Sequence, residues 1–210
     1  FWRVSNAEHL AMSEDCGIVN LSHFHMVDIA GPDHVELLEW LCAAKIGGDA
    51  NIGKGIYTHF LDDEGMVRAD FTVFRMADRC RLVNGADAGP RDFHYVRRIA
   101  EDRGLDVTIT DVSEKFVTIG IWGPNARVTL KKVVEDPAGL DPENFAFAAI
   151  KPIRIGGKDV TAFRISYVGE QGWELHMRYE DGLAVWDALR STGVMAFGVE
   201  TYANSRRMEK

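Results

Sequence analysis

An alternating hairpin near the middle of the chain places the strongest constraint on its fold. Ile56 to Leu61 and Met66 to Met76 alternate apolar and polar residues on either side of the tetrapeptide Asp62-Asp63-Glu64-Gly65. Alternation with a period of two is typical of strands that bury one face, and glycine permits the backbone of a tight turn. The sequence therefore predicts two antiparallel strands joined at this turn.

Short strands and helices succeed one another along the rest of the chain, without an internal repeat or a low-complexity tract. Helices are predicted over 6–15, from 31–33 onward, and over 91–103, 124–134 and 182–191. Strands are predicted over 18–29 (as a pair), 79–84, 107–110, 116–121, 150–155 and 160–166. Hairpins with helices between them are typical of an α+β fold.

Charge and composition argue against several classes of partner. The net charge is −8, and no Lys/Arg cluster occurs beyond Arg97-Arg98 and Arg206-Arg207, so no nucleic-acid partner is expected. No apolar run approaches the roughly 20 residues that span a bilayer, so no membrane partner is expected. No G-x-G-x-x-G follows a strand, so this chain has no dinucleotide-binding unit of its own.

The cysteines, the histidines and the chain ends carry weaker signals. Three cysteines are scattered along the chain: Cys16, Cys42 and Cys80. They form no C-x-x-C pair, which predicts free buried thiols and a reducing compartment, the cytoplasm. His23 and His25 are predicted on one strand face, but two histidines without a third ligand do not predict a zinc site. Because the chain opens on Phe1 without Met and closes in a helical stretch, we expect a fragment of a longer protein.

A second predicted hairpin, Ile165 to Leu175, carries a carboxylate in an unusual place. It opens as an apolar strand, turns through Gly169-Glu170-Gln171-Gly172, and re-enters a strand in which Glu174 stands between two large apolar residues. Burial of such a carboxylate without a partner is costly. Either Glu174 has a partner, which a ligand can supply, or it faces solvent, and strand alternation allows both.

A second carboxylate, Asp70, stands within the strand of the first hairpin. Aspartate is depleted in strand interiors, so its presence there needs a reason. The turn lies midway between Tyr57 and Asp70, so we expect the two side chains to approach across or diagonally. The structural alternative is an exposed Asp70 paired with Arg68 or Arg75.

Both hairpins resemble motifs of the aminomethyltransferase (glycine cleavage T-protein) family. Ser166 to Leu175 resembles its S-Y-x-G-E-x-G-W-E-L motif, in the form found in dimethylglycine and sarcosine dehydrogenases. Tyr57 to Gly65 resembles the family's Y-x-x-x-L-N-x-x-G, and the following strand resembles G-x-x-x-D-[LF]-x-V. Where the family often has a paired Asp-Asp, this chain has Ala69-Asp70.

The resemblance implies a tetrahydrofolate site. It places Glu174 against the pterin, where a carboxylate accepts two parallel N–H bonds. It places Asp70 beside folate N5 and N10 as the principal catalytic group, which stabilises developing positive charge and takes the released proton. Tyr57 would line the same pocket. Asn84, at the end of a strand, and Tyr167, in the second motif, are further candidates for cofactor binding.

The family is built as a three-lobed ring around the folate, which implies a truncated form of that fold here. The second lobe would comprise roughly 31–112, inserted into a first lobe of 1–30 and 113–210, and the third lobe would follow Lys210. Leu21-Ser22-His23, Gly31-Pro32 and Gly123-Pro124-Asn125-Ala126-Arg127 also match family motifs. We interpret these as scaffold, since proline suits the first turn of a helix.

The implied activity is transfer of a one-carbon unit from a small-molecule methyl donor to tetrahydrofolate. Demethylation of an N-methylated glycine is favoured by the form of the second motif. Ala203 stands where the stand-alone glycine-cleavage enzymes carry a folate-contacting Arg, which also favours the demethylation branch. The nearby Arg206 is predicted to be an exposed surface residue rather than a substitute. The implied partner is a flavin-dependent oxidoreductase domain or subunit, so any FAD would bind outside these residues.

Two alternatives stay open at this point. The chain could be a folate-binding relative without transferase chemistry, such as the iron–sulfur assembly factors of this fold. Those proteins carry K-G-C-x-x-G-Q-E, and the absence of a cysteine at Val168 to Gly172 argues against them. It could also be a structural lobe of a larger flavin-dependent amine dehydrogenase, and Ala203 keeps that reading open.

Overall fold

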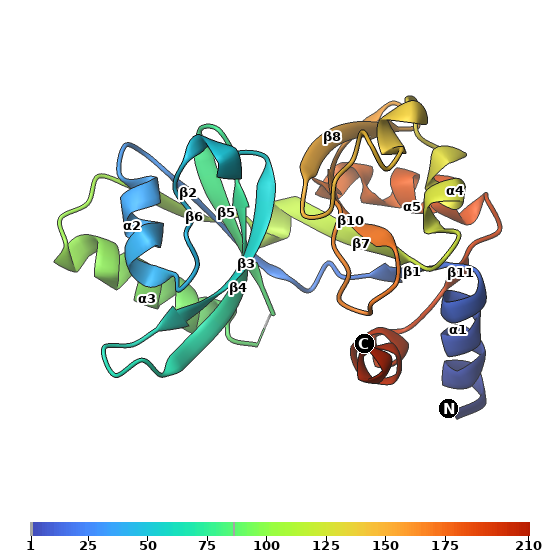
Figure 1. The fold of residues 1–210 in the computed structure, drawn as a ribbon, viewed down its shortest axis with the longest axis horizontal. Helices are drawn as coiled ribbons and strands as arrows, with labels where there is room; N and C mark the ends of the chain where they lie inside the picture. The colour runs from blue at the N-terminus through green and yellow to red at the C-terminus, as the bar shows by residue number, and fades with distance from the viewer. Residues whose placement is uncertain (1, 86) are drawn as a thin grey trace. The chain divides into compact units, whose positions relative to one another are not determined.

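The computed structural model of this protein describes residues 2–85 and 87–210. They form two compact units, one made of Phe1–Ser22 with Glu114–Lys210 and the other of His23–Ser113. We call these the discontinuous unit and the inserted unit, and Figure 1 colours them along the chain. Both combine helices with a mainly antiparallel sheet, so the predicted α+β fold is confirmed.

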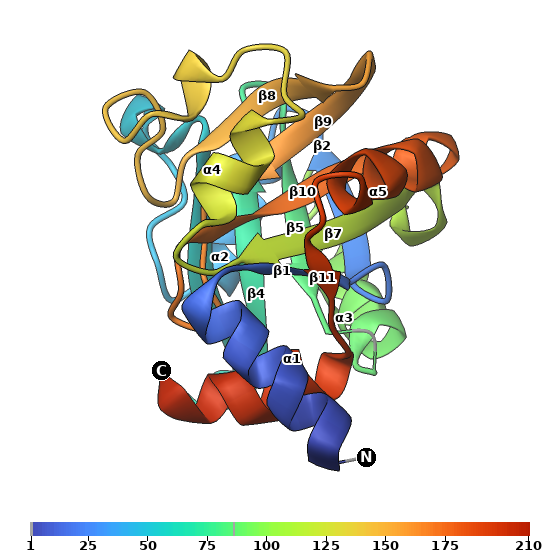
Figure 2. The same cartoon turned by 90° about the vertical axis from the view of Figure 1, so that its right-hand side faces the viewer.

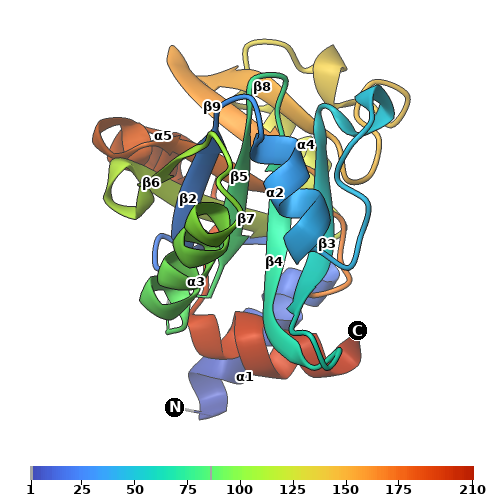
Figure 3. The ribbon, with the colours of Figure 1, turned by 90° about the vertical axis from the view of Figure 1, so that its left-hand side faces the viewer.

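The inserted unit contains a five-stranded antiparallel sheet in the order β3-β4-β5-β2-β6. Its strands are β2 (His25–Ala30), β3 (Lys54–Leu61), β4 (Val67–Arg75), β5 (Arg79–Asn84) and β6 (Thr108–Asp111). Helices α2 (His34–Leu41) and α3 (Gly89–Asp102) lie on one face of this sheet (Figure 3). A short 3-10 turn, Asp49–Asn51, precedes β3.

Strand alternation gives the inserted sheet two chemically different faces. The helix-covered face holds the core, whose larger members are Leu37, Leu38, Leu41, Phe60, Phe71, Val73, Leu82 and Val96. The intervening residues of β3 and β4, including Tyr57 and Asp70, therefore lie on the opposite face. The predicted hairpin is confirmed, with His59 paired to Asp70 and a bulge between Phe60 and Leu61.

The discontinuous unit contains a six-stranded sheet in the order β11-β1-β7-β10-β9-β8, antiparallel except for the parallel β1–β11 pair. Its strands are β1 (Gly17–Asn20), β7 (Phe116–Trp122), β8 (Ile150–Ile155), β9 (Lys158–Phe163), β10 (Gly172–Arg178) and β11 (Met195–Ala196). One face packs into an apolar core that includes Ile119, Ile121, Trp173, Leu175 and Met177. The other face carries Thr118, Trp122, Glu174 and His176, by alternation along β7 and β10.

The helices of this unit are α1 (Trp2–Glu14), α4 (Ala126–Lys131) and α5 (Gly182–Arg190). Short 3-10 turns occur at Ser113–Lys115, Ala138–Leu140 and Tyr179–Asp181. The chain ends in a π-helix, Thr201–Arg206, and a 3-10 turn, Arg207–Glu209, which we call the C-terminal segment (201–209). Figure 2 shows this segment beside α1, and His9 Nδ1 lies 2.6 Å from Ser205 Oγ. No helix in the described ranges is both long and apolar enough to cross a membrane.

Three sequence expectations differ from the structure. The strand pair predicted over 18–29 is wrong as a pair, because β1 and β2 belong to different sheets. Since β2 pairs with β5 and β6, the inserted unit begins at His23 rather than near Gly31. The strand predicted at Ile165 to Tyr167 is wrong as well, because β9 ends at Phe163 and the following residues are irregular.

Candidate functional site

Tyr57 and Asp70 lie together on the face of the inserted sheet that no helix of this unit covers. Tyr57 Oη donates to Asp70 Oδ2 at 3.0 Å, so the predicted approach of these two side chains is confirmed. The Tyr57 ring also meets the His59 ring edge to face, with centroids 5.3 Å apart. Both Tyr57 and Asp70 are exposed, and within the described ranges no arginine lies within ion-pair distance of Asp70. The exposed position given by the structural alternative is confirmed, whereas its pair with Arg68 or Arg75 is wrong.

Asn84 does not lie with Tyr57 and Asp70. In the register of β4 and β5, Thr72 pairs with Val83, so Asn84 is on the helix-covered side of the sheet. Its Nδ2 donates to Asp92 Oδ2 of α3 at 3.2 Å. The cofactor role of Asn84 stays a prediction, and its contact with α3 gives it a structural role within this unit.

Glu174 lies on the polar face of the other sheet, in the discontinuous unit. Only 8 % of its surface is exposed, so the solvent-facing reading of the sequence is wrong. Its Oε2 lies 3.3 Å from Nε2 of His176, two residues further along β10. Its cross-strand neighbour on β7 is Gly120, which has no side chain to cover the carboxylate.

Tyr202 of the C-terminal segment lies near this carboxylate and belongs to a cluster of aromatic rings. Trp122 stacks on Tyr202 of the C-terminal segment at 5.2 Å between centroids, and Tyr202 lies 4.9 Å from Tyr167. Burial and then the nearby Glu174 carboxylate raise the pKa of Tyr202, so this phenol stays neutral. Tyr167, a predicted cofactor-binding residue, is exposed, and its ring contacts Tyr202, the neighbour of Glu174. Sequence reasoning missed Tyr202 and His176, although the spacing of Glu174 and His176 along one strand was a readable signal.

Basic side chains in residues 206–210 donate hydrogen bonds to the loop that precedes β10. Arg206 is 4 % exposed, so its predicted surface position is wrong. Its guanidinium donates to Glu170 Oε1 at 2.5 Å and to Glu209 Oε2 at 2.7 Å. Arg207 donates to the carbonyl of Tyr167 at 3.1 Å, and Lys210 Nζ donates to the carbonyl of Ser166 at 2.7 Å.

The start of α4 holds the other side of this loop. Arg127 donates to Gln171 Oε1 at 3.0 Å, and the Gly123 amide donates to the carbonyl of Gln171 at 2.9 Å. Gly123 has a φ of +136°, and a Cβ there would lie 2.4 Å from the Asp15 carbonyl oxygen. The Gly123–Arg127 motif therefore acts as scaffold for the Gly169–Gly172 turn.

The histidines and thiols offer no further site. His23 precedes β2 and is exposed, whereas His25 is buried in β2 with Nε2 3.2 Å from Asp111 Oδ2, so the shared strand face predicted for them is wrong. Within residues 2–85 and 87–210, no group of three or more His, Cys, Asp or Glu side chains is arranged to hold a metal. Burial raises the pKa of Cys42 to about 12 and of Cys80 to about 11, so neither thiol is a nucleophile at neutral pH.

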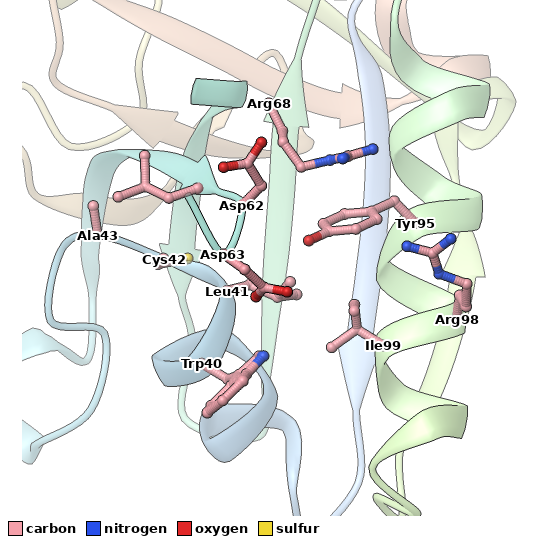
Figure 4. A pocket seen from close by; sticks show the side chains of 11 residues that line it. Trp40, Leu41, Cys42, Ala43, Asp62, Asp63, Arg68, Tyr95, Arg98 and Ile99 are labelled. Atoms are coloured by element: carbon pink, nitrogen blue, oxygen red, sulfur yellow. The ribbon is translucent and has the colours of Figure 1, made fainter. Parts of the chain in front are cut away.

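A cavity of about 300 Å³ opens between α2, the hairpin tip and α3 in the inserted unit (Figure 4). Arg68 and Arg98 lie 4.4 and 5.4 Å from the centre of the Tyr95 ring in its wall. Asp62, also in the wall, accepts the amides of Glu64 and Met66 and so closes the hairpin turn. None of the predicted site residues lines this cavity.

Comparison with known proteins gives consistent matches over the whole chain. The profile of the GCVT N-terminal domain matches residues 1–210. The mitochondrial dimethylglycine dehydrogenase of Rattus norvegicus is 32 % identical over 216 residues, which cover 100 % of this chain and 24 % of that protein. An aminomethyltransferase of Cupriavidus necator is 31 % identical over 202 residues, which cover 91 % of this chain and 53 % of that protein. The chain thus spans about a quarter of the first relative and about half of the second.

Two solved structures share the fold. Aminomethyltransferase T of the glycine cleavage system from Bartonella henselae matches with a TM-score of 0.82 at 24 % identity, over 98 % of this chain and 54 % of that one. A heterotetrameric sarcosine oxidase from Corynebacterium sp. U-96 matches with a TM-score of 0.65 at 15 % identity, over 90 % of this chain and 91 % of that one. The chain therefore belongs to the GCVT N-terminal domain family and has the fold of the aminomethyltransferase T proteins.

Proposed function

We propose that this chain is the folate-binding part of a tetrahydrofolate-dependent one-carbon transferase. The observation that carries the proposal is the buried Glu174 carboxylate near Tyr202, whose ring contacts those of Trp122 and Tyr167. A carboxylate is an acceptor only, and it suits a planar ligand that presents two neighbouring N–H donors. The rings supply flat apolar surface of the kind on which a bicyclic ligand stacks.

Asp70 is the proposed catalytic group. Tetrahydrofolate supplies the amine nitrogens that accept the one-carbon unit. Positive charge develops at the reacting nitrogen, and a fixed carboxylate stabilises that charge and can take up the released proton. Tyr57 holds one oxygen of Asp70 through the 3.0 Å hydrogen bond and so fixes the orientation of the carboxylate. The other oxygen then faces the reacting nitrogen.

The proposed donor is a small N-methylated amine of the glycine type, and the proposed reaction is its demethylation. The names of the dimethylglycine dehydrogenase and sarcosine oxidase relatives support this choice. FAD and the oxidation step would belong to a domain or subunit outside these residues. A third lobe of the same ring would also lie outside them. The cytoplasmic location stays a prediction, and the rat relative carries the word mitochondrial in its name.

Calorimetric titration of tetrahydrofolate into the intact protein tests the binding proposal. Glu174→Gln keeps the shape of the side chain and removes the charge, so we expect affinity to fall about 10- to 100-fold. Glu180→Gln, which removes the same charge from an exposed position of this unit, serves as the matched control and should leave affinity unchanged. Absence of binding to the unaltered protein would favour a structural lobe. Equal binding by Glu174→Gln would show that the pterin lies elsewhere.

A further inference from the structure

A row of three buried polar side chains crosses the polar face of the discontinuous unit's sheet. His176 Nδ1 lies 2.9 Å from Thr118 Oγ1 on β7, and His176 Nε2 lies 3.3 Å from Glu174 Oε2 on its own strand. The exposed fractions of Thr118, His176 and Glu174 are 0, 2 and 8 %. Thr118 and His176 are direct cross-strand partners, so the row is fixed by strand register rather than by a loop.

The neighbours of His176 decide which of its ring nitrogens carries the proton. A carboxylate oxygen can only accept, so Nε2 must carry a proton where it faces Glu174. In the neutral ring, Nδ1 then bears the lone pair, and the Thr118 hydroxyl can donate to it. In this arrangement Thr118 donates to Nδ1, and Nε2–H is at ion-pair distance from the carboxylate without meeting hydrogen-bond geometry. The opposite tautomer would set a lone pair of Nε2 against the carboxylate.

Other groups around Glu174 in this unit do not replace His176 as its N–H neighbour. The residues opposite on β9 are Phe163 for Glu174 and Thr161 for His176, and neither is charged. Tyr202 is a neutral phenol and Tyr167 lies beyond it in the ring cluster. The guanidinium of Arg207 sits 4.6 Å from the centre of the Tyr167 ring. Among the described residues, His176 is the one cation-forming group at ion-pair distance from Glu174.

We propose that His176 is a positioning residue for the Glu174 carboxylate, with its tautomer set by Thr118. Its Nε2–H, 3.3 Å from Oε2 of Glu174, orients the carboxylate electrostatically, so that Oε1 accepts from a planar ligand with adjacent N–H donors. This assignment rests on the proposed tetrahydrofolate function, but the tautomer itself does not depend on any ligand.

The tautomer is measured by NMR of the intact protein labelled with 15N-histidine. The His176 signals are those that disappear in His176→Gln, and at neutral pH they should show a protonated Nε2. Thr118→Val removes the donor to Nδ1, so the fraction of the Nδ1–H form should rise. A His176 ring protonated at Nδ1 alone would overturn the proposal. An unchanged tautomer in Thr118→Val would overturn the role of Thr118.

Two substitutions of His176 separate positioning from packing. The side-chain nitrogen of glutamine reaches the place of Nε2, whereas that of asparagine reaches only the place of Nδ1. We expect His176→Gln to keep tetrahydrofolate affinity within about 3-fold and His176→Asn to lose about 10- to 100-fold. Thermal melts confirm that both variants fold.

The outcomes distinguish this inference from the proposed function. If both variants fold and lose affinity equally, His176 has only a packing role and the inference is wrong. The Glu174→Gln titration still tests the function in that case. If the unaltered protein does not bind tetrahydrofolate, the proposed function fails and so does the ligand-presenting role of His176. The NMR measurement then decides whether His176 still orients Glu174 through Nε2–H.

Discussion

Asp70 differs from Asp28 and Asp92 of the inserted unit because no cation among the described residues lies at ion-pair distance from it. Asp28 pairs with Arg81 at 2.6 Å and Asp92 pairs with Arg91 at 2.8 Å, whereas the hydrogen-bond partner of Asp70 is the phenol of Tyr57 at 3.0 Å. A phenol fixes the position of a carboxylate and leaves its negative charge available. That combination suits a group that must stabilise a cation formed during a reaction.

Asp70→Asn should therefore leave the fold intact and lower the rate of one-carbon transfer by about 10²-fold or more. The amide keeps the size of the side chain and loses both the charge and the capacity to take a proton. The measurement is steady-state formation of the methylene adduct of tetrahydrofolate by the intact protein. Asp63→Asn, an exposed change at the hairpin tip, is the control with the same loss of charge. Near-normal turnover in Asp70→Asn would refute the catalytic assignment.

For individual residues, neighbours in the sequence predict some properties and not others. The sequence shows the unusual position of Glu174 between Trp173 and Leu175, but not its burial, because its neighbours include Tyr202 of the distant C-terminal segment. Arg206 was interpreted as a surface residue for the same reason. Its partner Glu170 lies 36 positions away in the sequence, so local sequence patterns do not predict this ion pair.

At the scale of elements, the packing of the polar face of β7 and β10 depends on a glycine at position 120. Gly120 pairs with Glu174 across the strands, and a Cβ at Gly120 would lie 2.0 Å from Cζ3 of Trp122. Trp122 is fully buried and stacks on Tyr202, so its indole has little freedom to withdraw. The glycine thus allows the indole to lie flat across the sheet beside the carboxylate.

Gly120→Ala should lower the free energy of unfolding by about 1–3 kcal/mol, the usual cost of an overpacked core. It should also weaken tetrahydrofolate binding, because the displaced indole carries Tyr202 with it. Urea unfolding followed by tryptophan fluorescence measures the first effect, and near-UV circular dichroism reports the indole. Gly198→Ala is the matched control, since the nearest atom to its Cβ would be 3.8 Å away. Equal stability of the two variants would contradict the packing account.

The elements themselves could be predicted well from local pattern, and their pairing could not. The hairpin of β3 and β4 follows from alternation and a glycine turn, both of which are local. At Ile165 to Tyr167 an apolar run wrongly predicted a strand, because side chains rather than a neighbouring strand satisfy its carbonyls. Trp122 Nε1 donates to Ile165, Lys210 to Ser166 and Arg207 to Tyr167.

At the scale of the whole molecule, one unit is inserted into the sequence of the other. The inserted unit runs without interruption from His23 to Ser113, and all five strands of its sheet lie within that range. Resemblance to the family predicted an insertion of roughly 31–112. The first strand of the inserted sheet was misassigned because Ile18 to Ile29 has one continuous apolar pattern, and pattern alone does not say which sheet each half joins.

The boundary can be tested by expressing two fragments. Residues 23–113 contain the complete sheet, both helices and an apolar core of their own, so we expect this fragment to fold cooperatively. The shorter fragment 31–113 lacks β2, which lies between β5 and β6 and contributes Val27 and Ile29 to the core. Its loss leaves β6 without a partner strand and exposes the edge of β5, so the shorter fragment should not fold. Dispersed amide signals and a sigmoidal urea transition for 23–113, with neither for 31–113, are the expected results. A folded 31–113 fragment would show that β2 is dispensable and that the unit begins where the family motif placed it.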